Sequence, residues 1–174
     1  MPWFKRKTPT PVRVSSDTSP KGVYSGLRQN ALSIKRDDID VSSPLNNAPV
    51  WGILMETGHG AVTATLFALA DGTTSLYLSN GGGVIGGHAH ETVRIANASF
   101  MNQANHSLEH LKATAMFPIP EPAHTVFYVL TDSGILTGGA LENDLGHGRH
   151  PLSPLFHAGH ELITQLRVIS EAGA

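Results

Sequence analysis

The sequence predicts an α+β fold in which a five-stranded, mainly antiparallel sheet carries two helices on one face. Three observations lead to this fold class. Short apolar segments are separated by turn sequences, which is typical of antiparallel strands. Two longer segments repeat their apolar residues with the period of an amphipathic helix. The chain has 174 residues and no cysteine, so its stability has to come from an apolar core rather than from disulfides.

The strands are predicted from five short apolar segments that end at turn sequences. The first, VWGILMET, is closed by Gly58-His59-Gly60. The second contains the strand-favouring Thr63 and Thr65 and ends at Asp71-Gly72, a strong hairpin signal. Tight turns of this kind produce an antiparallel meander. The expected strands span residues 50–57, 61–70, 73–79, 125–131 and 135–141.

Two amphipathic helices are predicted between and after these strands. The first runs from Glu91 to about residue 115, and the second runs from Ser153 to about residue 169. Ser153 is followed by a proline, a frequent combination at a helix start. The apolar stripe of the first helix consists of Val93, Ala96, Asn97, Phe100, Ala104, Leu108, Leu111 and Ala115. Such a stripe packs on a sheet, so the expected architecture is a two-layer sandwich.

The resulting order of elements is β-β-β-α-β-β-α. This mix of elements resembles the profilin-like and roadblock/longin-like groups of small domains, although no family motif accompanies it. The resemblance implies a role as a dimerisation or docking platform. A fold by itself does not determine a function.

Residues 1–48 are expected to form a mostly flexible basic tail, and residues 49–174 a single α+β domain. Residues 1–22 contain four prolines among serines and threonines, and such a composition buries too little apolar surface to offset its ordering entropy. Residues 25–42 hold enough apolar side chains for a short packed segment. Two aromatic residues and three cations between Trp3 and Lys7 form either a solvated terminus or a contact with an anionic membrane surface or a partner.

Charge and composition narrow the classes of function. Residues 1–48 hold eight Lys or Arg and four Asp, whereas residues 49–174 hold four Lys or Arg and ten Asp or Glu. An acidic folded part argues against nucleic-acid binding, which needs clustered cations. No apolar run reaches the roughly 20 residues of a membrane helix, and no secretory signal is recognised. A cytoplasmic protein is expected.

A glycine-rich run precedes the first predicted helix and is a candidate anion or nucleotide site. Glycines let the backbone approach an anion closely, and a helix start supplies free N–H groups. The run lacks the spacing of the P-loop and of dinucleotide-binding motifs. The structural alternative is a tight crossover that needs positive φ angles. The candidate ligand-binding residues are Asn80, Gly81, Gly82, Gly83, Gly86, Gly87 and Arg149.

The ten histidines raise the hypothesis of a metal site, although no cofactor is predicted from a motif. Imidazole and carboxylate groups suit zinc and other transition metals. The candidate ligands in two loops are His88, His90, Glu91, His147 and His150. They form one site only if residues 142–152 cross the sheet to meet the glycine-rich run. His157 and His160 flank the apolar face of the last helix and are expected to be partly buried.

These patterns leave three functional hypotheses, because no catalytic motif is present. The leading one is a non-catalytic interaction or regulatory domain that self-associates or binds a protein partner. The first alternative is a small anion or nucleotide binder that uses the glycine-rich run. The second alternative is a metal-dependent hydrolase built on the histidines.

Overall fold

The computed structural model describes residues 17–39 and 48–173. The expectation for Trp3 to Lys7 lies outside these residues. The main elements are α1 (Pro20–Ser33), β1 (Val50–His59), β2 (Val62–Leu69), β3 (Thr74–Leu78), β4 (Gly83–Ile85), α2 (Glu91–His106), β5 (Lys112–Ala113), β6 (His124–Thr131), β7 (Gly134–Leu141), α3 (Glu142–Gly146) and α4 (Ser153–Ala172). No helix within this described part is long and apolar enough to cross a membrane.

The strands form a single antiparallel sheet in the order β4-β3-β2-β1-β6-β7-β5. The α+β class, the antiparallel sheet and the five predicted strands are confirmed. The number of strands is corrected from five to seven. The two additional strands, β4 and β5, are three and two residues long. They are too short for an alternating pattern to be recognised, and β4 lies inside the glycine-rich run.

Helix α2 is shorter than the sequence predicts. Five residues of its predicted stripe are buried, but the helix ends at His106, and residues 108–110 form a 3-10 turn. The side chains of Asn105 and Ser107 donate hydrogen bonds to carbonyl oxygens four residues earlier. Such local bonds compete with the helical ladder. Ala115, expected on the buried stripe, is therefore exposed at a bend outside the helix.

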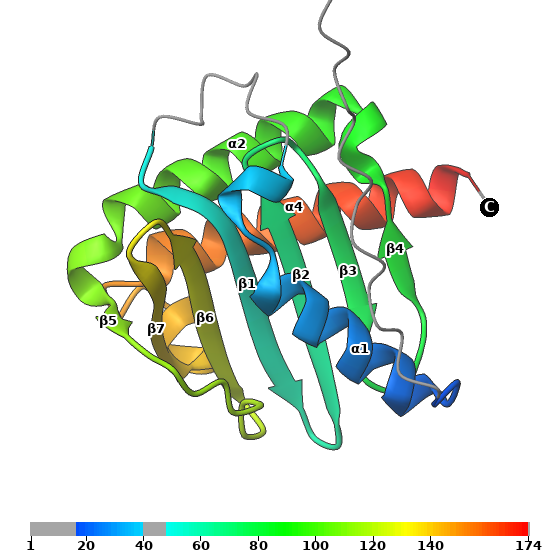
Figure 1. The fold of residues 1–174 in the computed structure, drawn as a ribbon, viewed down its shortest axis with the longest axis horizontal. Helices are drawn as coiled ribbons and strands as arrows, with labels where there is room; N and C mark the ends of the chain where they lie inside the picture. Colours follow the sequence, from blue (N-terminus) through cyan, green and yellow to red (C-terminus); the bar gives the residue numbers. More distant parts are fainter. Residues whose placement is uncertain (1–16, 40–47, 174) are drawn as a thin grey trace, which may run out of the picture.

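Helices α2 and α4 pack together on one face of the sheet, as predicted (Figure 1). Gly159 of α4 lies against Met55 of β1 and Phe100 of α2. The other face is not left open, because α1 crosses it in front of β1 to β3 (Figure 1). Tyr24 of α1 is bonded through its hydroxyl to Thr65 of β2. The two-layer sandwich is thus corrected to a sheet covered on both faces.

The physical reason for this correction lies in β1. Every residue from Val50 to Gly58 is buried, so burial does not alternate along the strand. A continuous apolar run is typical of a strand covered on both faces. Tyr24, Ala31 and Ile39 from the first part of the chain join the same core as β1.

Candidate functional site

The residues at the start of α1 favour a helix that begins there. The Ser19 side chain accepts a hydrogen bond from the Gly22 N–H at 3.1 Å, and Pro20 occupies the first turn. Both features favour a helix start at this point. Tyr24, Arg28 and Leu32 follow at intervals of four residues, so they lie along one side of the helix.

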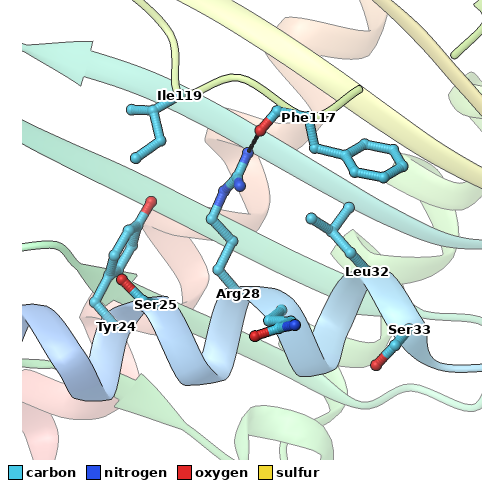
Figure 2. A pocket seen from close by; sticks show the side chains of 8 residues that line it. Tyr24, Ser25, Arg28, Leu32, Ser33, Phe117 and Ile119 are labelled. Carbon is cyan, nitrogen blue, oxygen red and sulfur yellow. Dashed lines mark hydrogen bonds between the residues drawn. The ribbon is translucent and has the colours of Figure 1, made fainter. Parts of the chain in front are cut away.

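This side of α1 borders a pocket of about 520 Å³, which we call the α1 groove. Its opposite wall is a largely extended segment, residues 114–122, that leads toward β6. Figure 2 shows Tyr24 and Ile119 at one end of the groove, Leu32 and Phe117 at the other, and Arg28 between them. The lining residues are Tyr24, Ser25, Arg28, Gln29, Leu32, Ser33, Phe117 and Ile119.

Arg28, a lining residue of the groove, forms an ion pair with the buried Glu56 of β1. Arg28 donates from Nε to one oxygen of Glu56 at 2.7 Å and from one terminal nitrogen to the other oxygen at 2.8 Å. The same nitrogen donates to the Phe117 carbonyl oxygen at 2.8 Å. The Glu56 side chain is fully buried, and the Arg28 side chain is 12% exposed. One guanidinium therefore ties α1, β1 and the extended segment together.

Three tyrosine hydroxyls surround this ion pair. The Tyr24 hydroxyl bonds with Thr65, whose own hydroxyl donates to Glu56, and the Tyr128 hydroxyl donates to the Pro118 carbonyl oxygen. The Tyr77 hydroxyl is enclosed without a hydrogen-bond partner among the described residues. Burial, followed by the negative charge of Glu56, raises the pKa of all three phenols above its ordinary value.

A first prediction concerns alkaline titration. The chain has three tyrosines, so spectrophotometric titration at the phenolate absorbance should show none that ionises freely near the ordinary pKa of 10.0. The stability that the folded protein retains by burying neutral phenols is fully present below that pH. It is lost as the pH rises further, because the unfolded chain releases phenolic protons that the folded chain retains. Phenolate absorbance should therefore rise together with unfolding measured by circular dichroism, and a tyrosine that ionises before unfolding would contradict this environment.

The chemical character of the groove follows from these contacts. Arg28 is the one cation among the described lining residues. Glu56 neutralises it, so the guanidinium has little charge left to attract an anion. Leu32, Phe117 and Ile119 supply apolar walls, while Ser25 and Gln29 supply polar groups along the rim. The edge-to-face contact of Phe117 with Tyr128, with ring centres 5.5 Å apart, fixes one wall. The arrangement suits uptake of an uncharged apolar side chain rather than acid-base catalysis.

The glycine-rich run forms the turn and the short strand at the sheet edge. A Cβ at Gly83 would collide with the Leu76 carbonyl of β3, and Gly86 has a positive φ of 85°. Asn80, Gly81 and Gly82 form the turn before β4, and Gly87 packs against Leu166. These contacts account for the glycines without a ligand. Arg149 follows β7, which is far from β4 in the strand order, and it pairs with Asp144 at 2.8 Å.

The candidate metal ligands are likewise spread over the molecule. His88, His90 and Glu91 are exposed at the start of α2. His147 and His150 lie between α3 and α4, after β7. The start of α2 follows β4, which is at the opposite edge of the sheet. Within residues 17–39 and 48–173, no three His, Asp or Glu side chains are grouped so that they could hold a metal ion. Of the two histidines expected at the edge of the core, His160 is half-buried, but His157 is exposed.

Sequence reasoning missed the residues of the α1 groove. One available signal was Glu56, the single charged residue in the apolar run of β1, because a buried carboxylate requires a partner. A second signal was the spacing of Tyr24, Arg28 and Leu32. Neither signal identifies the extended segment as the opposite wall, since Phe117 is 89 positions from Arg28.

Comparisons of the chain with protein-family models, with curated proteins and with solved structures give no match. Function therefore has to be inferred from the chain's own residues.

Proposed function

We propose that the protein is a non-catalytic interaction domain that self-associates through the α1 groove. The observation that carries this proposal is a pair of exposed apolar side chains beside an apolar pocket. Met116 is 75% exposed and Ile119 is 53% exposed. Met116 directly precedes Phe117, which lines the groove at the same end as Leu32 (Figure 2).

The groove is suited to a second copy of the same chain. A twofold dimer places the same patch of both subunits in contact, so a protruding side chain and its receiving pocket have to lie on one face. Met116 is a flexible protruding group, and the pocket beside it has room for a thioether side chain. The internal neutralisation of Arg28 by Glu56 further favours an apolar partner surface.

Other surfaces of the described residues support self-association less well. The edge strands β4 and β5 are only three and two residues long, and short edges resist pairing with another sheet. One face of the sheet is covered by α2 and α4. The exposed Ile95 and Val168 lie on these helices away from any described pocket, and single apolar residues on a surface are ordinary.

The test is sedimentation equilibrium of the tag-free protein from micromolar to submillimolar concentration. We expect a monomer–dimer equilibrium for the wild type and weaker dimerisation for Met116→Glu. Burying most of a Met side chain contributes about 1.5 kcal/mol or more, and a twofold dimer contains the contact twice. The dissociation constant of the variant should therefore rise by about 100-fold.

Matched controls are Ile95→Glu and Val168→Glu, which introduce the same charge at apolar residues of similar exposure. Both should dimerise like the wild type. A wild-type protein that stays monomeric at the highest concentration contradicts self-association. Dimers that respond to the control substitutions but not to Met116→Glu would move the interface from α1 to the helices on the opposite face.

A further inference from the structure

A second pocket, separate from the α1 groove, lies where α3 meets α4 and the start of β6. Its volume is about 470 Å³, and we call it the α3–α4 pocket. It shares no lining residue with the α1 groove. The lining residues are Ala123, Glu142, Asn143, Gly146, His147, Phe156 and His160.

The backbone beside this pocket is held in an uncommon conformation. Ala123 has a φ of 61°, and it is the one non-glycine residue with a positive φ in the described part of the chain. Two hydrogen bonds of 2.8 Å fix it, from its N–H to the Gly58 carbonyl and from the Glu142 N–H to its own carbonyl. Conformations of this kind persist where surrounding contacts determine them, and they often occur at binding sites. The Glu142 backbone is therefore anchored to the sheet.

Two features make Glu142 the charged group of the pocket. Its carboxylate forms no hydrogen bond or ion pair with another described residue, so its negative charge is not compensated. Arg149, which lies between α3 and α4, is paired with Asp144. No Lys or Arg lines the pocket.

The two imidazoles of the pocket differ in what their ring nitrogens contact. The His147 Nδ1 lies 2.7 Å from the Asn143 carbonyl oxygen, which only accepts, so Nδ1 carries a proton; in the neutral imidazole the lone pair is then on Nε2. The His160 Nε2 is enclosed without a partner. An imidazolium would place an N–H there with nothing to accept it, and burial lowers the pKa of His160 despite the opposing effect of Glu142.

Aromatic surface completes the site. The rings of Phe156 and His160 are 4.3 Å apart and tilted by 52°. Both residues line the pocket opposite the polar groups of α3. Aromatic faces next to a carboxylate are favourable for organic cations, because the ring quadrupole and the negative charge attract the same ligand.

From this arrangement we infer that the α3–α4 pocket binds a protonated primary amine. Glu142 is the counter-ion, the Nε2 atom of His147 accepts a hydrogen bond from the ammonium group, and Phe156 packs on the aliphatic part of the ligand. The site is independent of self-association through the α1 groove, because the two share no residue.

The experiment follows the imidazole resonances of the tag-free full chain by NMR during titration with n-butylammonium chloride. The His147 and His160 signals should shift with saturation, whereas sodium butyrate at equal concentration should leave them in place. Glu142→Gln should weaken binding by about tenfold or more, since it removes the charged partner of the ammonium group. Glu161→Gln, which removes one negative charge from the exposed residue that follows His160 in α4, should bind like the wild type.

A second variant guards against misfolding of Glu142→Gln. His147 is exposed, so His147→Gln should keep the melting temperature and still weaken butylammonium binding severalfold. Equal binding by both variants and the wild type would overturn the inference. It would also be overturned if butyrate shifted the same signals, or if zinc chloride shifted them while butylammonium did not, since the imidazoles would then be a metal contact.

Discussion

Replacing Arg28 with alanine should lower the free energy of unfolding by about 3–5 kcal/mol. The reason is the fully buried carboxylate of Glu56, which receives both of its charged hydrogen bonds from Arg28. Without the guanidinium, Thr65 is the one described side chain that still donates to Glu56. The variant also loses the bond to the Phe117 carbonyl, so the extended segment is released from α1.

Urea unfolding monitored by circular dichroism measures this loss. The control is Arg149→Ala. Arg149 forms an ion pair with Asp144 at a similarly short distance. That pair is solvent-exposed, with 52% and 41% of the side chains accessible, and exposed pairs contribute about 0–1 kcal/mol. An Arg28→Ala variant as stable as the wild type would mean that Glu56 is not held as a buried ion.

A double variant separates the cost of an unpaired charge from the net contribution of the pair. Arg28→Met with Glu56→Met removes both charges and retains apolar volume. Replacement of a buried pair by apolar residues is often close to neutral, so the double variant should recover most of the stability. A double variant as unstable as Arg28→Ala would instead assign the loss to packing of α1 on the sheet.

The sequence predicted those elements whose signals are local. The strands that became β1, β2, β3, β6 and β7 each carry several strand-favouring residues, and the first four of them are followed by a turn that contains glycine. Their identification needs no knowledge of distant residues. The same holds for the buried stripe of α2, from Val93 to Ala104, because helical periodicity alone defines it.

The features that were missed depend on residues far apart in the chain. Helix α1 was expected only as a short packed segment within residues 25–42, and its first residues were assigned to the flexible tail. What holds it is the pair Arg28–Glu56 and the bond Tyr24–Thr65, which join residues 28 and 41 positions apart. The α3–α4 pocket likewise combines Ala123 with His160. Such sites arise from contacts between elements that are distant in the chain, and local patterns do not define these contacts.

Replacing Phe100 with alanine should lower the free energy of unfolding by about 3–5 kcal/mol. Phe100 is fully buried in α2, between α4 and the central strand β1. Its removal leaves a cavity that the sheet and the two helices cannot close without moving. Thermal unfolding should show a midpoint lowered by roughly ten degrees. Ile95→Ala on the exposed side of the same helix, where the side chain is 64% accessible, should change stability by less than about 0.5 kcal/mol.

A second substitution tests whether Phe100 is tightly packed against α4. A Cβ added at Gly159 would lie 3.1 Å from the Phe100 ring and 2.6 Å from the Met55 sulfur. Gly159→Ala should therefore be destabilising in the wild type and less so, or even stabilising, in the Phe100→Ala background. The gain in helix propensity, about 1 kcal/mol, is present in both backgrounds. The difference between the effects of Gly159→Ala in the two backgrounds therefore isolates the steric effect. If the two substitutions changed the free energy of unfolding additively, α2 and α4 would adjust independently. That result would contradict direct packing of the Phe100 ring against the Gly159 backbone.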